Sequence, residues 1–214
     1  MIISKIQEHL DSLMVRYPEM DCCKESIFAA FSVLSECFRN GKKLLVAGNG
    51  GSSADSDHIV GELMKGFLKP RKLREESVRA IMNVDPEKGK FISDSLQGAL
   101  PAIALSGQPA LTTAFMNDCE PLLCFAQQVN GYGTQGDVFW GISTSGNSPN
   151  IIYAATVAKA KGLKIIGLTG EKQSKLSSIA DVCIRVPRTE TFKIQELHLP
   201  VYHCLCMMLE EAFF

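Results

Sequence analysis

Four side chains that can bind a divalent metal occur in two segments far apart in the sequence. His58 and Glu62 are four residues apart, so a helix would place both on one face. Gln195 and His203 are eight residues apart, which is two helical turns, and would share one broad side of another helix. Imidazole, carboxylate and amide groups together could hold a divalent metal such as zinc. The same glutamate could act as a general base and the same histidine as a general acid.

The two remaining histidines are not assigned to this set. His198 lies between Gln195 and His203 and could either support the ligands or serve only the core. We expect His9, on the first predicted helix, to lie at the surface. A lone histidine in an apolar helix is more often a satisfied core residue than a ligand, so that alternative stays open for both segments.

A glycine-rich loop follows the first predicted strand. Residues 48–55 read GNGGSSAD, and such glycines let backbone N–H groups approach an anion at the start of a helix. The loop is not a P-loop, because GxxxxGK[ST] is absent. It is not the dinucleotide fingerprint either, because Ser53 occupies the third glycine position. The structural alternative is a tight turn with a serine N-cap.

A second loop, residues 143–150, reads STSGNSPN and also precedes a predicted helix, whose first turn suits Pro149. Its clustered hydroxyls belong to Ser143, Thr144, Ser145 and Ser148. Hydroxyls and free N–H groups without a nearby Lys or Arg suit a small phosphate monoester better than a triphosphate with Mg²⁺. Two such loops at the ends of strands of one sheet are more specific than either alone.

The apolar pattern predicts an α/β fold with a doubly wound, five-stranded parallel sheet. Strands are expected at residues 43–48, 101–106, 137–143, 163–169 and 181–186. Helices are expected near residues 53–66, 110–129, 148–161, 173–179 and 191–213. Strands that alternate with helices form a parallel sheet covered on both faces, and ligands bind at its carboxyl ends.

We expect residues 1–214 to form a single domain with two additions. Residues 1–40 predict two helices, the second with an apolar face so broad that another subunit could help to cover it. Residues 66–100 form a long insertion. Because a structureless loop of this length is uncommon in a compact domain, we expect either a partly helical excursion or a functional lid. The charges of this insertion are typical of a solvated surface.

Composition excludes several classes of protein. Lys and Arg number 22 against 23 Asp and Glu, so the net charge of −1 gives no electrostatic footprint for nucleic acid. No apolar run is long enough for a membrane span, and the first residues do not resemble a secretory signal, so we expect a cytoplasmic protein. The eight cysteines lie in apolar stretches, and we expect them to be reduced and buried.

Three ordered motifs, residues 48–62, 143–148 and 194–203, resemble those of the phosphoheptose isomerases. These proteins are a branch of the SIS (sugar isomerase) domain family, which has a flavodoxin-like sheet. The resemblance implies isomerisation of sedoheptulose 7-phosphate to D-glycero-D-manno-heptose 7-phosphate through an enediol, for lipopolysaccharide or capsule synthesis. It also implies a homotetramer with the N-terminal helices in a central bundle and the sites at subunit interfaces.

The resemblance also implies roles for individual residues. One zinc ion per subunit would be held by His58, Glu62, Gln195 and His203, with Glu62 as general base and His203 as general acid. The sugar phosphate would contact Asn49, Gly50, Gly51, Ser52, Asn117, Asp118, Ser143, Thr144, Ser145, Ser148 and Gln195. Glu62 cannot be a tight zinc ligand and a free base at one instant. Either it moves when substrate binds or the metal mainly organises the site.

The sequence departs from the family pattern in two places. Lys193 stands where the family usually has arginine. The 66–100 insertion is longer than the corresponding link in typical members, and it follows the helix of His58 and Glu62, so it could reshape the sugar pocket.

Other functions remain open. SIS proteins also serve as sugar-phosphate sensors and as protein-binding tetramers, one of which binds the bacterial replication initiator, but such proteins do not need the full metal-binding set. An isomerase of a different phosphosugar is a further alternative. A dehydrogenase is disfavoured, because neither a complete dinucleotide fingerprint nor a ribose-binding acid is evident.

Overall fold

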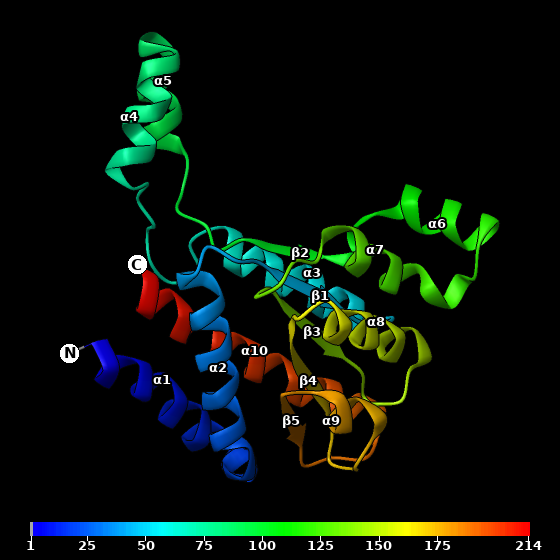
Figure 1. The fold of residues 1–214 in the computed structure, drawn as a ribbon. Helices are drawn as coiled ribbons and strands as arrows, with labels where there is room; N and C mark the ends of the chain where they lie inside the picture. The colour runs from blue at the N-terminus through cyan, green and yellow to red at the C-terminus, as the bar shows by residue number, and fades with distance from the viewer. Residues whose placement is uncertain (1) are drawn as a thin grey trace.

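A five-stranded parallel sheet lies at the centre of the computed structural model, which describes residues 2–214 (Figure 1). Its strands are β1 (Leu44–Ala47), β2 (Ala102–Ala104), β3 (Val138–Ile142), β4 (Lys164–Gly170) and β5 (Val182–Val186). They lie in the order β2-β1-β3-β4-β5. The strand order therefore reverses beside β1, and such a switch point opens a crevice at the carboxyl ends of β1 and β3. The predicted fold class is confirmed.

Helices cover both faces of the sheet, and each face has its own apolar core. One core includes residues from α1 (Ile2–Arg16), α2 (Lys24–Arg39), α3 (Gly51–Met64) and α10 (Thr191–Phe213). The other includes residues from α7 (Cys124–Tyr132), α8 (Pro149–Ala160) and α9 (Lys175–Ile179). Neighbouring strand residues alternate between the two cores, as Val46 and Leu45 do, because successive side chains of a strand point to opposite faces.

The two predicted N-terminal helices are α1 and α2, joined by a 3₁₀ turn at Pro18–Cys23. Most of the broad apolar face of α2 packs into the domain's own core, where Ile27 and Leu34 are fully buried. Phe28 on α2 and Val15 on α1 remain exposed. Part of the apolar surface on these helices is therefore not covered by this chain, and the oligomer bundle stays a prediction.

The helix expected over residues 110–129 is in fact two helices, α6 (Pro109–Asp118) and α7, separated by a 3₁₀ turn at Pro121–Leu123. Pro121 is the cause, because proline forces the residue before it out of the helical region. Glu120 accordingly adopts φ −79° and ψ 110°. The break lets α6 project from the body of the domain (Figure 1).

All eight cysteines are free thiols. The prediction that they are buried holds for five but is wrong for Cys22 and Cys119, which are exposed, while Cys183 is partly buried. Cys22 lies in the surface turn before α2, and Cys119 follows the projecting helix α6. Apolar neighbours in sequence did not bury these two thiols, because turns and helix ends face solvent.

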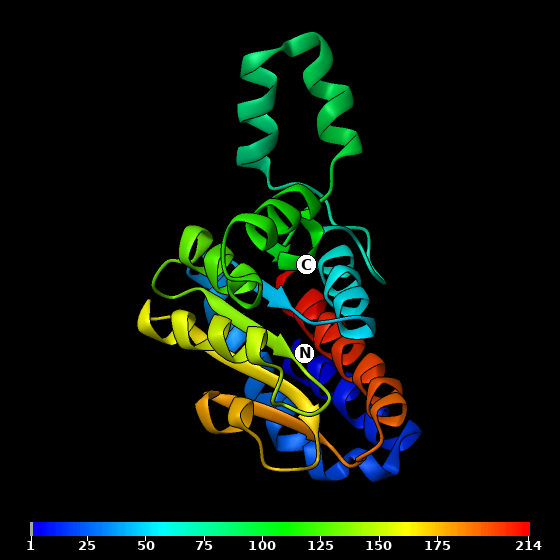
Figure 2. The same cartoon turned by 90° about the vertical axis from the view of Figure 1, so that its right-hand side faces the viewer.

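Residues 66–100, predicted to be an insertion, contain a helical hairpin of α4 (Glu75–Val84) and α5 (Pro86–Ser95), which stands away from the domain (Figure 2). Asp85 joins the helices and caps α5 by accepting a hydrogen bond from the Lys88 amide. A Cβ at Gly89 would lie 2.9 Å from Met82 Cα, so glycine permits the close helix pairing. The insertion is thus a partly helical excursion. No helix in residues 2–214 has the length and apolarity to cross a bilayer.

Candidate active site

The loops after β1 and β3 line one pocket of about 260 Å³ at the carboxyl edge of the sheet. Eight of the predicted binding residues line it: Asn49, Gly50, Gly51, Ser52, Ser143, Thr144, Ser148 and Gln195. Helices α3 and α8 both begin at this pocket, so their N-termini face it. Helix N-termini present unpaired N–H groups and a positive dipole end, so two of them beside hydroxyl groups favour an anion such as phosphate.

The glycines of the first loop are required by its geometry. A Cβ at Gly48 would overlap the Ser52 carbonyl oxygen, and Gly50 has a φ of +55°. A Cβ at Gly51 would lie 2.6 Å from Gln195 Nε2. These residues therefore let α3 begin tightly against β1 and let the Gln195 amide approach the start of α3.

The second loop holds its hydroxyls through bonds within the loop. Ser143 Oγ and Ser148 Oγ are 3.0 Å apart, and both line the pocket. Ser145 instead accepts a hydrogen bond from the Asn147 amide, is exposed and does not line the pocket. A Cβ at Gly146, which has φ +64°, would overlap the Ser174 hydroxyl. The structure thus brings three of the four predicted hydroxyls to the pocket.

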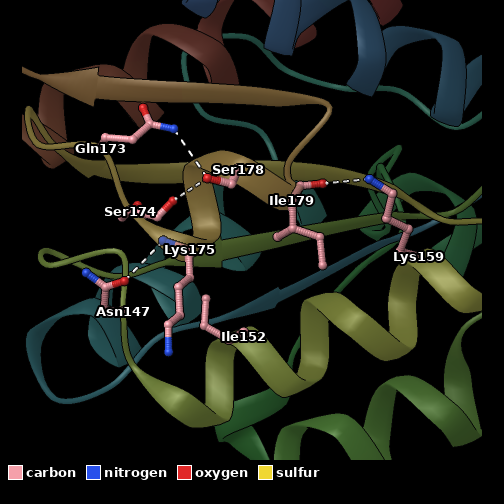
Figure 3. Close-up of a pocket in the computed structure, with 8 residues that line it drawn as sticks. All are labelled: Asn147, Ile152, Lys159, Gln173, Ser174, Lys175, Ser178 and Ile179. Carbon is pink, nitrogen blue, oxygen red and sulfur yellow. Dashed lines mark hydrogen bonds between the residues drawn. The ribbon is translucent and has the colours of Figure 1, made fainter.

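A larger depression of about 670 Å³ lies between α8 and α9 (Figure 3). Several of its polar groups are already bonded: the Lys175 amide donates to Asn147 Oδ1, and Lys159 Nζ donates to the Ile179 carbonyl. It contains none of the predicted site residues. We therefore take the smaller loop pocket, which has the clustered hydroxyls and the two helix N-termini, as the candidate site.

Three of the four predicted metal-binding side chains meet where α3 packs against α10. His58 Nε2 lies 3.3 Å from Glu62 Oε1 and 3.4 Å from His203 Nε2. The pairing of His58 and Glu62 on one helical face is as predicted. Gln195 lies about two turns before His203, roughly 12 Å along α10, and lines the loop pocket. The pocket and this cluster are thus successive parts of one surface along α3 and α10.

A tyrosine and an aspartate that the sequence analysis missed support the cluster. Tyr202 is buried, and its hydroxyl lies 3.0 Å from His58 Nδ1 and donates to Asp55 Oδ1 at 3.2 Å. Asp55 lies three residues before His58, and Tyr202 directly precedes His203. Those spacings were the available signal, but a tyrosine in an apolar helix looks like an ordinary core residue.

Burial is the largest cause of the pKa shifts of Tyr202, Asp55 and His203. Burial and the neighbouring Asp55 carboxylate raise the pKa of the Tyr202 phenol. Burial also raises the pKa of Asp55, although the hydrogen bond from Tyr202 opposes this shift. Burial and the adjacent His58 ring lower the pKa of His203.

The donor atoms fit a divalent metal. Ligand atoms bound to one tetrahedral zinc at about 2.0–2.1 Å lie roughly 3.3–3.4 Å apart, which matches both distances from His58 Nε2. Glu62 Oε2 is buried and has no hydrogen-bond partner; Lys65 Nζ is 3.6 Å away. Among residues 2–214, no three or more His, Cys, Asp or Glu side chains are already arranged around a single point for a metal. The fit to a metal therefore rests on the two distances from His58 Nε2 and on the imidazole and carboxylate donors.

The structure does not bring every predicted residue to the site. Asn117 and Asp118 lie exposed at the end of α6, bonded to each other at 2.8 Å, and do not line the loop pocket. His198 is fully buried, neither ring nitrogen makes a hydrogen bond of ordinary geometry, and burial lowers its pKa to about 4. It is a core residue. His9, expected at the surface, is half-buried because α1 packs on α10.

The strand order of the sheet is flavodoxin-like, and the SIS domain family model matches residues 95–170, which include β3 and the loop that follows it. A phosphoheptose isomerase from Aneurinibacillus thermoaerophilus is 39% identical over 179 residues, which is 84% of this chain and 77% of the relative. One from Geobacter sp. strain M21 is 33% identical over 213 residues, covering 96% of its length. The chain belongs to the phosphoheptose isomerase family, as the three motifs predicted.

The solved structure of a phosphoheptose isomerase from Neisseria gonorrhoeae is similar throughout. It has a TM-score of 0.73 and 28% identity, and the match covers 98% of this chain and 99% of that one. The enzyme from Francisella tularensis gives 0.72 and 29% over 97% of both chains. The likeness therefore includes the N-terminal helices as well as the sheet.

Proposed function

We propose that this protein isomerises a phosphorylated sugar, converting sedoheptulose 7-phosphate to D-glycero-D-manno-heptose 7-phosphate. The observation that carries the proposal is the arrangement of two sites along α3 and α10. An anion-type pocket lies at the start of α3, and the His58–Glu62–His203 cluster begins about two turns, roughly 10 Å, further along. A sugar with a phosphate at one end and its carbonyl near the other suits this separation.

The loop pocket would bind the phosphate. Ser143, Thr144 and Ser148 offer hydroxyls, and the two helix N-termini offer N–H groups and positive dipole ends. No Lys or Arg is among the residues that line it. Binding of this remote group would hold the sugar so that its reacting carbons lie beside the cluster.

Glu62 and His203 would transfer the protons. Glu62 removes a proton from C1 of the ketose, and the released electron pair forms the C1–C2 double bond while His203 protonates the carbonyl oxygen at C2. The product of this step is an enediol. In the second step, the O1 proton returns to His203, the C1 carbonyl forms, and Glu62 delivers its proton to C2. The aldose results and both side chains regain their starting states.

Zinc bound by His58, Glu62, Gln195 and His203 would polarise the sugar carbonyl and stabilise negative charge on its oxygen. To join this set, Gln195 has to turn its amide from Gly51 toward His203. Glu62 has to keep one oxygen for the substrate proton. Its two oxygens already differ, since Oε1 faces His58 while Oε2 has no hydrogen-bond partner.

We also propose that the protein acts in the cytoplasm as a homotetramer, supplying heptose for lipopolysaccharide or capsule. The exposed side chains of Phe28 and Val15 on the N-terminal helices support assembly, because this apolar surface is not covered within one chain. The His58 side chain is 42% exposed, which leaves space for a second subunit to cover the site. Light scattering should give the mass of four subunits, and a monomer at micromolar concentration would contradict this assembly.

The activity is tested by incubating purified protein with sedoheptulose 7-phosphate and with shorter ketose phosphates, with and without a chelator, and following the aldose by NMR. We expect conversion of the heptulose phosphate, loss of conversion after chelation, and recovery with zinc. Equal turnover with and without the chelator would contradict a role for the metal in the reaction. Binding of phosphosugars without any conversion would favour a sensor.

Replacing Ser148 with alanine should weaken substrate binding and leave the chemical step intact. Losing one hydrogen bond to a charged phosphate, roughly 1.5–3 kcal/mol, should raise KM about 10- to 100-fold with little change in kcat. Ser145→Ala is the matched control, because its hydroxyl lies in the same loop but outside the pocket. Steady-state kinetics that gave equal KM values for the two variants would place the phosphate elsewhere.

A further inference from the structure

A chain of hydrogen bonds runs from Asp55 through Tyr202 to His58, behind the catalytic cluster. The Tyr202 hydroxyl lies 3.2 Å from Asp55 Oδ1 on one side and 3.0 Å from His58 Nδ1 on the other. Tyr202 is buried, and its ring packs edge-on against both His58 and His203, with centroids 5.4 and 5.0 Å apart. The phenol is therefore held in one orientation.

The number of protons in this chain determines its direction. A phenol hydroxyl has one hydrogen to donate, and a carboxylate can only accept. Tyr202 therefore donates to Asp55 and accepts from His58, which requires a proton on His58 Nδ1. In the neutral imidazole the other nitrogen, Nε2, then carries the lone pair.

Nε2 faces the cluster, 3.3 Å from Glu62 Oε1 and 3.4 Å from His203 Nε2. Because the Glu62 carboxylate also can only accept, it competes with Tyr202 for the single proton of the neutral ring, and the contacts of Tyr202 with Asp55 and His58 have to outweigh it. We propose that Asp55 and Tyr202 are positioning residues, which hold His58 as the Nδ1–H tautomer so that Nε2 is available as a ligand. Such partners of a ligating histidine fix its ring orientation and tautomer. The inference about metal binding rests on the proposed function, but the tautomer itself can be measured without metal or substrate.

The tautomer is tested first in the metal-free protein. Two-bond ¹H–¹⁵N correlation spectra of ¹⁵N-histidine-labelled protein, recorded where the imidazoles are neutral, identify the protonated nitrogen of each ring. We expect His58 to be protonated at Nδ1 only, and His58→Gln assigns the signal. A His58 ring protonated mainly at Nε2 would overturn the proposal.

Two variants test the cause. In Asp55→Asn the new amide can donate to the phenol, so the Tyr202 proton can turn toward His58, and an Nε2–H population should appear. Tyr202→Phe removes the acceptor and should give mixed tautomers. Asp57→Asn is the matched control, since Asp57 is exposed on the same helix and its carboxylate accepts a hydrogen bond from Ser106 Oγ at 3.4 Å, away from Tyr202. An unchanged His58 spectrum in both test variants would overturn the proposal.

Zinc affinity is the second readout, measured by competition with a chromophoric chelator. We expect Asp55→Asn and Tyr202→Phe to weaken binding about 10- to 100-fold, and Asp57→Asn to leave it unchanged. If the tautomers shift as expected but the protein converts no sugar phosphate, the proposed function fails and the positioning role stands. If the protein is an active isomerase with His58 protonated at Nε2, the reverse holds.

Discussion

Replacing Glu62 with glutamine is expected to abolish isomerisation and leave sugar-phosphate binding nearly intact. The amide has the same shape but cannot accept a carbon-bound proton, and general base catalysis contributes about 10²- to 10⁴-fold. We therefore expect kcat to fall by about that factor or more. The phosphate pocket begins roughly 16 Å away along α3, so binding measured by calorimetry should change little.

Two controls make the Glu62 result specific. Glu196→Gln changes an exposed carboxylate of α10 and should keep full activity. Metal content is measured in parallel, because Glu62 is also a proposed ligand, and kinetics are compared at saturating zinc. An equal loss of binding and turnover in Glu62→Gln would contradict the division of roles between the loop pocket and the cluster.

The second large effect concerns a buried ion pair that holds the end of α3. Arg71 and Glu210 are 2% and 1% exposed, and Arg71 Nε donates to Glu210 Oε1 at 2.8 Å. Arg71 also donates to the carbonyls of Glu62 and Leu63 at 2.8 and 2.7 Å. The Glu210 carboxylate accepts three further bonds, from the amides of residues 67–69. The pair therefore ties the last turn of α3 to α10.

Glu210→Ala should lower the free energy of unfolding by about 3–5 kcal/mol, because it leaves the Arg71 guanidinium buried without its charge partner. Urea denaturation measures the effect, and Glu196→Ala, at an exposed site, should change stability by no more than about 0.5 kcal/mol. Removing both charges, in Arg71→Met with Glu210→Leu, should recover part of the loss. A loss below about 1 kcal/mol in Glu210→Ala would contradict this role.

The same pair gives stability a dependence on acid pH. Burial alone would raise the pKa of Glu210, but hydrogen bonds from the backbone at Phe67 and Leu68 and from Arg71 outweigh it, so the pKa lies below its usual 4.5. A carboxyl with a lowered pKa binds protons more weakly in the folded state. Its stabilisation is therefore present above the unfolded pKa and is lost as pH falls through the folded pKa. Urea midpoints should fall in acid less steeply for Glu210→Gln than for wild type, and parallel curves would contradict this.

Sequence reasoning reached the parts of the site that follow from local geometry. The pairing of His58 with Glu62 needs only the 3.6-residue period of one helix, and the two loops follow strands whose apolar runs are plain. The spacing of Gln195 and His203 correctly put them on one side of α10. It did not show that Gln195 lines the loop pocket, while His203 lies in the cluster with His58 and Glu62.

The contacts that were missed join residues distant in sequence. Tyr202 meets Asp55 only because α10 packs on α3, and neither residue type stands out in its own helix. Arg71 lies in a stretch whose charges predict a solvated surface. It is buried instead, where it pairs with Glu210, a residue near the end of the sequence. The break at Pro121 was readable, since proline restricts the residue before it, yet the apolar pattern on either side favoured one helix.

The rate of conversion of sedoheptulose 7-phosphate, followed by NMR with wild-type protein and Glu62→Gln side by side, tests the central claim most directly. The proposed function predicts that aldose phosphate accumulates with the wild type, and that Glu62→Gln binds the same sugar without converting it. A wild-type protein that binds the sugar but forms no aldose, or a Glu62→Gln variant that converts it at the wild-type rate, would contradict the proposed function and its mechanism.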